Sequence, residues 1–203
     1  MHSPGIEAAW QALEALRPQQ VAALSGAELK DGAWLIKSFC WQYLIQPRRR
    51  SIQALQPQGR VLTERLGYFF HHLLLWWLVG AKGLPAEGRW VKPQGLQGGE
   101  FFFQGSHALP LGPLGQRFGS DKEGFLRRAL QLDAQVLPQG SLAGDAAVKL
   151  QVLPGFPVLL LLWLEEPSAP GRLQLLLERK LQYELNLDLI WCGLMLACLL
   201  MLS

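Results

Sequence analysis

The sequence predicts an α+β protein, with an antiparallel sheet of five or more strands packed by two very apolar helices. Residues 33–46 and 146–177 alternate apolar and polar side chains or form short apolar runs, as strands do. Residues 61–81 and 187–202 are helical segments with almost no polar face, which is typical of helices buried in a core. Half of the 203 residues are hydrophobic and 17% are charged, so the chain can form one large core.

Two helices are predicted at the start of the chain. Ser3-Pro4 is typical of a helix N-cap followed by proline at the first helical position, and apolar residues follow at helical spacing. This helix should end before Pro18, and a second short one is expected over residues 19–24. We therefore interpret residues 1–30 as an N-terminal helical segment and residues 31–203 as a single α+β domain.

Three strands are expected next. Residues 33–38 and 41–46 each alternate, with a break near Phe39-Cys40. Pro47 and the three arginines that follow it predict a turn, and residues 51–55 predict the third strand.

The helix predicted over residues 61–81 contains an apolar run of about 14 residues, interrupted by His71 and His72. A run this short and this polar cannot span a bilayer, so we interpret the helix as the centre of the core.

Residues 83–120 are rich in glycine and proline, a composition that favours loops. Short strands are expected at residues 88–91 and 100–104, and a helix over residues 121–133. A long, weakly structured segment inside a compact domain is often functional.

The last third of the chain predicts three more strands and a final helix. The strands cover residues 146–153, 157–164 and 172–177, and the short turns between them favour antiparallel pairing. The helix over residues 187–202 has an uncharged part about 21 Å long, against about 30 Å of membrane hydrocarbon. We expect it to pack in the core rather than to act as a membrane tail.

Charge and cysteine content exclude several classes of protein. The net charge of +3 argues against an electrostatic nucleic-acid binder, and three cysteines exclude a disulfide scaffold. The N-terminus lacks a basic region followed by an apolar run, so we expect no secretory signal, a cytoplasmic location and reduced thiols. A phosphate loop, a dinucleotide fingerprint and a nucleophile elbow are all absent, so the sequence predicts neither a cofactor nor a reaction.

Candidate binding residues in the glycine-rich loop, residues 95–110, are Phe101, Phe103, Ser106 and His107. Adjacent Ser and His do not form a nucleophile–base pair by themselves, so a histidine satisfied within its loop is the alternative.

Further candidates lie at one end of the predicted sheet, where Asp145 precedes a strand and Glu165-Glu166 follow the most apolar one. Carboxylates this close can raise the pKa of one of the pair, although adjacent exposed carboxylates are also normal in turns. Asp145 is equally typical of a turn residue bonded to its own backbone.

No set of residues has the spacing of a metal site. His71 and His72 point about 100° apart on a helix, and Cys192 and Cys198 do not share a helical face. Core packing is the expected role of the cysteines.

Several segments in order resemble the bacterial and archaeal domain of unknown function 3786. They are GAKGLPAEGRW (80–90), GGEF (98–101), FQGSH (103–107), Leu114, Phe118-Gly119, GDA (144–146), LPGFPVLLLLWLEE (153–166) and YELNLD (183–188). The resemblance covers about residues 30–200 and implies a link to anaerobic metabolism, with corrinoid or iron–sulfur association. Some members carry an iron–sulfur motif ahead of the domain. The first 30 residues here contain no cysteine, so no cluster is expected in this chain.

The leading hypothesis is an accessory or binding protein rather than an enzyme, with an unknown small molecule or protein as its partner. A corrinoid is the candidate that the resemblance supplies. One alternative is an enzyme with a pocket formed by His107, Asp145 and Glu165, which requires these groups to converge. The other is a peripheral membrane protein held by the apolar segment 185–202.

Overall fold

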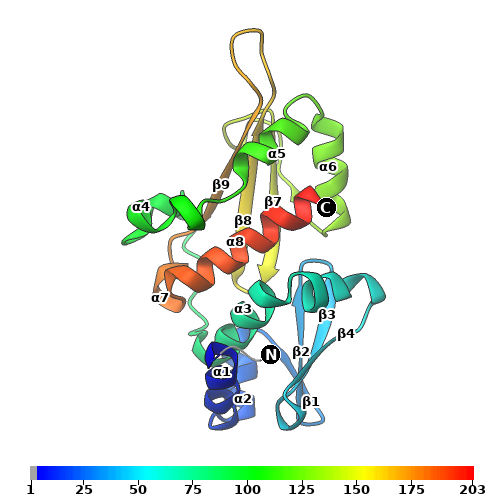
Figure 1. The fold of residues 1–203 in the computed structure, drawn as a ribbon, viewed down its shortest axis with the longest axis vertical. Coiled ribbons are helices and arrows are strands. Elements are labelled where there is room, and N and C mark those ends of the chain that lie inside the picture. Colours follow the sequence, from blue (N-terminus) through cyan, green and yellow to red (C-terminus); the bar gives the residue numbers. More distant parts are fainter. Residues whose placement is uncertain (1–3) are drawn as a thin grey trace.

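The computed structural model describes residues 4–203 and has the predicted α+β architecture (Figure 1). Within these residues the strands form two antiparallel sheets, one of four strands and one of five. The predicted five-stranded antiparallel sheet is therefore present. The sequence did not reveal that the strands of residues 28–54 form a second sheet of their own.

Two helices begin the described chain, as predicted. They are α1 (Pro4–Glu14) and α2 (Pro18–Ser25), while the predicted cap at Ser3 lies outside the described residues. Trp10 and Leu13 are buried, and α1 packs against the helix α3 (Gly67–Gly80). α2 ends at Gly26, whose φ of 73° is in the left-handed region that favours glycine.

The first sheet, which we call sheet A, contains β1 (Glu28–Lys30), β2 (Ala33–Ser38), β3 (Trp41–Gln46) and β4 (Ser51–Ala54) in that order. Trp34, Tyr43 and Ile45 are buried on one of its faces. The Tyr43 ring lies 4.6 Å from that of Phe70 on α3, and its hydroxyl donates to the Gly59 carbonyl. Burial raises the pKa of Tyr43 above its usual range.

The second sheet, sheet B, has the order β5-β9-β8-β7-β6. Its long strands are β7 (Ala146–Leu153), β8 (Phe156–Trp163) and β9 (Arg172–Glu178), which confirms the three strands predicted there. The edge strands β5 (Trp90–Val91) and β6 (Gln135–Val136) are short. The continuous apolar run of β8 is explained by burial on both faces of this central strand, because successive residues, which point to opposite faces, are buried alike.

The two sheets are joined at the part of β7 that the short strand β6 does not pair with. The backbone N–H of Phe39 donates to the carbonyl of Gln151 at 2.9 Å, and the Ser38 hydroxyl donates to that of Val152 at 2.6 Å. These bonds satisfy backbone groups of β7 that no strand pairs with.

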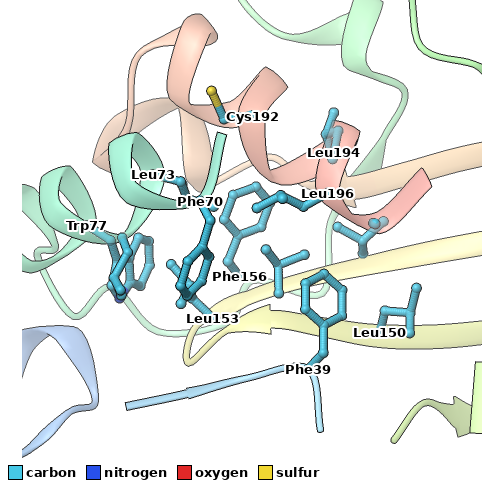
Figure 2. Close-up of a cluster of buried hydrophobic side chains, with 14 of the residues drawn as sticks. Phe39, Phe70, Leu73, Trp77, Leu150, Leu153, Phe156, Cys192, Leu194 and Leu196 are labelled. Atoms are coloured by element: carbon cyan, nitrogen blue, oxygen red, sulfur yellow. The ribbon is translucent and has the colours of Figure 1, made fainter. Parts of the chain in front are cut away.

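The predicted final helix is α8 (Leu187–Leu202), with the bounds expected from the sequence. It crosses in front of sheet B and packs against α3 (Figure 1). Gly193 permits this approach: a Cβ placed on it would lie 2.6 Å from the Phe156 ring and 3.3 Å from Leu73. Figure 2 shows Phe156 and Leu73 in the resulting cluster with Phe70 and Trp77.

Ten of the sixteen residues of α8 are buried. This burial argues against the alternative in which the segment serves as a membrane anchor. Among the described residues, no helix combines the length and apolarity that crossing a bilayer would need.

The glycine- and proline-rich middle of the chain is more helical than predicted. Residues 100–104 are not a strand: they overlap α4 (Gly99–Phe102). A Cβ at Gly99 would lie 2.2 Å from the Pro93 carbonyl oxygen, so only glycine fits at this position. The chain makes a tight turn here and is not extended. The helix α5 (Leu111–Phe118) was not predicted, whereas α6 (Lys122–Gln131) was.

A buried ion pair holds part of this middle segment in place. Lys180 Nζ lies 3.5 Å from Glu184 Oε1 and donates to the carbonyl of Leu84 at 2.6 Å. The other oxygen of Glu184, which belongs to α7 (Leu181–Glu184), accepts from the backbone of Lys82. Residues 82–84 have no regular secondary structure, and contacts with this ion pair hold them in place.

Candidate functional site

The loop predicted to be functional lies beside the first turns of α8. Its buried anchors are Leu96 and Phe103, each 4% exposed, whereas Phe101 is 82% exposed. Gly98 has a φ of 76° and starts α4. Of the predicted candidates in this loop, Phe101, Ser106 and His107 thus face or reach the surface, and Phe103 is part of the core.

His107 is the centre of an aromatic cluster that joins this loop to α8. Its ring lies 4.3 Å from that of Phe102 and 4.9 Å from that of Trp191, between ring centroids. His107 Nε2 is 4.0 Å from Asp188 Oδ1, beyond hydrogen-bond distance. Ser106 Oγ is 3.5 Å from His107 Nδ1, at the limit of a weak hydrogen bond.

Next to this cluster, a pocket of about 330 Å³ opens between α3 and α8. We call it the α3–α8 pocket. Its size is at the lower end of the range of small-molecule sites, which is about 300–1,000 Å³. α3 and α8 both contribute aromatic or polar side chains to its wall, which consists of Tyr68, His72, Trp76, Asn186, Asp188, Leu189, Trp191 and Cys192.

Helix geometry explains how α3 supplies its part of the wall. Tyr68, His72 and Trp76 are four residues apart, so they form one stripe along the helix. The rings of Tyr68 and His72 lie 5.5 Å apart. On its other side His72 meets α1: a Cβ at Gly5 would lie 2.6 Å from His72 Nε2. Glycine at position 5 therefore allows α1 to approach this histidine.

Two ring nitrogens of the pocket residues are buried without a hydrogen-bond partner among residues 4–203. They are Nε1 of Trp191 and Nδ1 of His72. An unsatisfied buried polar group costs about 1–3 kcal/mol, so such groups are uncommon where packing alone decides the residue. The Trp191 ring also packs edge-on against Phe69 at 5.3 Å, which fixes its orientation.

The cysteines are poorly suited to bind metal or attack a substrate. Burial raises the pKa of Cys192 to about 12, helped by the charge of Asp188, and burial alone raises that of Cys198 to about 12. Burial also raises the pKa of Cys40, on the β2–β3 turn. Because the thiolate is the nucleophilic form, these thiols are poor nucleophiles. Within residues 4–203 no group of three His, Cys, Asp or Glu side chains converges as metal ligands would.

The acidic candidates lie at the far end of β7 and β8, where they make backbone bonds. Asp145 Oδ2 accepts from the Leu164 N–H at 2.7 Å, and the Asp145 N–H donates to Leu162. The N–H of Glu165 donates to the Gly119 carbonyl, and that of Glu166 to Ala169. The three side chains are exposed.

The structure thus brings Asp145 and Glu165 to one sheet end, and places His107 against α8. Asp145 lines a small pocket of about 200 Å³ together with Lys122, Leu126 and most of residues 136–147. This wall includes neither His107 nor Glu165. A catalytic centre combining all three residues stays a prediction.

Sequence reasoning missed the pocket residues on α3 and α8, because both helices are apolar on every side. The available signal was the presence of polar atoms in aromatic side chains, rather than an alternation of apolar and polar residues. Tyr, His and Trp at positions 68, 72 and 76 carry a polar atom at four-residue spacing, and Asp188 and Trp191 stand one turn apart on α8.

Fold and site together define an α+β protein with a surface pocket walled by aromatic residues. The chain belongs to the family described as Domain of unknown function (DUF3786), whose sequence profile matches residues 17–198. This confirms the family resemblance. Neither a curated protein nor a solved structure matches the chain.

Proposed function

We propose that this chain is a cytoplasmic binding or accessory protein whose ligand sits in the α3–α8 pocket and against the loop carrying His107. The observation that carries the proposal is that aromatic rings from α3 and α8 line one opening, with the His107 ring of the loop packed against one of them. Tyr68 and Trp76 come from α3, Trp191 comes from α8, and His107 comes from the loop. Half-exposed aromatic side chains with polar atoms are typical of ligand sites rather than of plain surface.

The chemistry of the pocket favours binding over reaction. Nucleophilic catalysis requires a nucleophile within hydrogen-bond reach of a base. The Cys192 thiol has its pKa raised to about 12, and the contact between His107 and Asp188 is 4.0 Å. The thiol is therefore a poor nucleophile, and His107 and Asp188 are too far apart for direct proton transfer.

The scaffold of the proposed site is the pair of apolar helices. We infer that α3 and α8 act together as the layer that packs sheet B, with Gly193 as their closest approach to Phe156. Such a layer holds the outward-facing rings of both helices in fixed positions. Preformed walls of this kind reduce the entropy lost on binding.

A flat, conjugated ligand matches rings that stand around an opening. A corrinoid or another tetrapyrrole is the candidate implied by the family resemblance. The metal of a tetrapyrrole needs an axial ligand, and the imidazole of His107 would supply it. The side chain of His107 is 35% exposed and can therefore be reached by a ligand. The pocket itself would hold only part of such a ligand, because its volume is about 330 Å³.

Titration tests this proposal with three probes: hydroxocobalamin, haemin and riboflavin, a flat molecule without a metal. We expect saturable quenching of tryptophan fluorescence and, for a tetrapyrrole bound through His107, a shift of its visible absorption. His107→Ala should abolish the absorption shift. Tyr183→Ala, which alters a half-exposed aromatic residue outside the pocket wall, is the matched control.

The outcomes separate the parts of the proposal. If riboflavin quenches the fluorescence and the tetrapyrroles do not, the proposal of a flat ligand is kept and that of a corrinoid is rejected. No saturable response to any of the three probes would reject a flat ligand in this pocket.

A further inference from the structure

We infer that the ligand of the α3–α8 pocket carries a positively charged nitrogen, which Asp188 and the surrounding aromatic faces recognise. The inference rests on the proposed function and specifies the chemistry of the ligand.

The wall carries a negative charge that no cation in it balances. Asp188 contributes a carboxylate with a side chain 71% exposed. None of the described residues that line the pocket is Lys or Arg. Among residues 4–203, the ion-pair partner of Asp188 is the imidazole of His107, which is not part of the wall and whose Nε2 lies 4.0 Å from Asp188 Oδ1.

The position of the pocket at the start of α8 does not reverse this sign. A helix N-terminus carries about half a positive elementary charge, which would favour an anion. Asp188 supplies a full negative charge in the first turn of the same helix, and Asn186 already caps the N–H of Leu189 at 3.0 Å. The carboxylate therefore outweighs the helix dipole by about half a charge.

The aromatic residues favour the same class of ligand. Tyr68, Trp76 and Trp191 belong to the wall, and the faces of tyrosine and tryptophan rings attract cations through their quadrupoles. Several such rings around a carboxylate form the type of cage that binds ammonium groups. The carboxylate beside these rings disfavours an anion in the same pocket, because like charges repel.

The test compares two probes that differ in one atom: choline and its neutral isostere 3,3-dimethylbutan-1-ol. Binding to the full chain at pH 8 is followed through the NMR signals of the tryptophan indole N–H groups, assigned with Trp76→Phe and Trp191→Phe. We expect choline to bind about tenfold more tightly than the alcohol. Benzoate, which is flat and anionic, should not bind measurably.

Variants of the carboxylate make the test specific. Asp188→Asn should bring the two affinities within about twofold of each other, and Asp188→Glu, which keeps the charge, should restore most of the preference. Asp145→Asn removes an exposed carboxylate at the distant sheet end and should change nothing at the pocket. Circular dichroism establishes that each variant is folded.

Equal binding of choline and the alcohol by the wild type, or tighter binding of benzoate, would overturn the inference. A preference for choline that survives in Asp188→Asn would also overturn the role of this residue. These results leave the proposed function intact if riboflavin or a tetrapyrrole still binds. The flat ligand of the proposed function fails separately when those probes give no response.

Discussion

α3 and α8 present two faces that differ in chemistry although both helices are apolar throughout. Their inner face meets the sheet through Leu73, Trp77 and Gly193, which surround Phe156 (Figure 2). Their outer face carries Tyr68, His72 and Trp191 and borders the pocket. On the inner face the residues are almost all hydrocarbon, whereas the outer face is built from rings with a polar atom.

The neighbouring tryptophans of α3 show what this difference means. Trp77 is 1% exposed, and its indole N–H donates to the Ser25 carbonyl at 2.9 Å. Trp76 is half-exposed and lines the pocket. The indole N–H of Trp77 is satisfied by the fold, whereas that of Trp191, which is also buried, has no hydrogen-bond partner within residues 4–203. Burial alone therefore does not separate structural rings from candidate binding rings; hydrogen-bond satisfaction helps to do so.

Removal of the inner ring should have the largest effect on stability. Phe156→Ala leaves a cavity at a position with 0% exposure, and we expect the free energy of unfolding to fall by about 3–5 kcal/mol. Urea denaturation measures this change. Phe101→Ala, at a position 82% exposed, is the matched control and should cost less than about 0.5 kcal/mol. Equal losses in the two variants would remove the distinction between the core and the surface around the pocket.

The approach of α8 to the sheet predicts a smaller effect at Gly193. In Gly193→Ala the new methyl group would lie 2.6 Å from the Phe156 ring. Overpacking costs about 1–3 kcal/mol, and better helix propensity returns about 1 kcal/mol, so we expect a net loss of up to about 2 kcal/mol. Phe156→Leu should lower the free energy of unfolding less in the Gly193→Ala variant than in the wild type, because the smaller leucine side chain makes room for the new methyl group. Additive losses in a double-mutant cycle would contradict direct packing.

On the outer face, substitution should affect binding rather than folding. Tyr68 is 65% exposed, so Tyr68→Ala should change the free energy of unfolding by less than about 0.5 kcal/mol. The same variant should weaken choline binding severalfold, because it removes one aromatic face of the pocket. Tyr183→Ala, at a tyrosine 50% exposed outside the pocket wall, should leave both quantities unchanged. A large loss of stability in Tyr68→Ala would place this ring in the core instead.

Patterns with a single physical cause were predictable from the sequence. The bounds of α8 follow from its uninterrupted apolar run after Asn186, and β7, β8 and β9 follow from their short turns. Residues 100–104 were mispredicted because three consecutive phenylalanines favour a strand by propensity. The decisive contact, between Gly99 and the Pro93 carbonyl, is a tertiary approach that propensity does not encode.

The candidate site was predictable in its loop and not in its helices. The glycine-rich composition identified the segment that contains His107, which does reach the aromatic cluster. A helix that is apolar all round gives no sequence signal for the face that remains open, so Trp76 and Trp77 could not be told apart. At the sheet end, Asp145 accepts a hydrogen bond from the backbone, as aspartates in many turns do.

The smallest expected effect concerns α1, which lies against the His72 side of α3. Arg50 holds this helix in place by contacting both Glu7 and Glu14, with its Nε 2.9 Å from Glu14 Oε1. The hydrogen bond from Arg50 lowers the pKa of Glu14. A carboxyl group whose pKa is lower in the folded state stabilises the fold above its ordinary pKa, and that contribution is lost as the pH falls through the lowered value.

Arg50→Gln should therefore lower stability slightly at pH 7, and the difference from the wild type should shrink on acidification as Glu14 becomes protonated. Urea denaturation at pH 7 and at successively lower pH measures the difference. The exposed neighbour Arg49 provides the matched control, since Arg49→Gln removes the same charge without the two glutamate contacts. If both variants showed the same pH dependence, overall charge and not the contact with Glu14 would explain it. A difference confined to Arg50 would show that an ionic contact with the turn between β3 and β4 helps to hold the N-terminal helix in place.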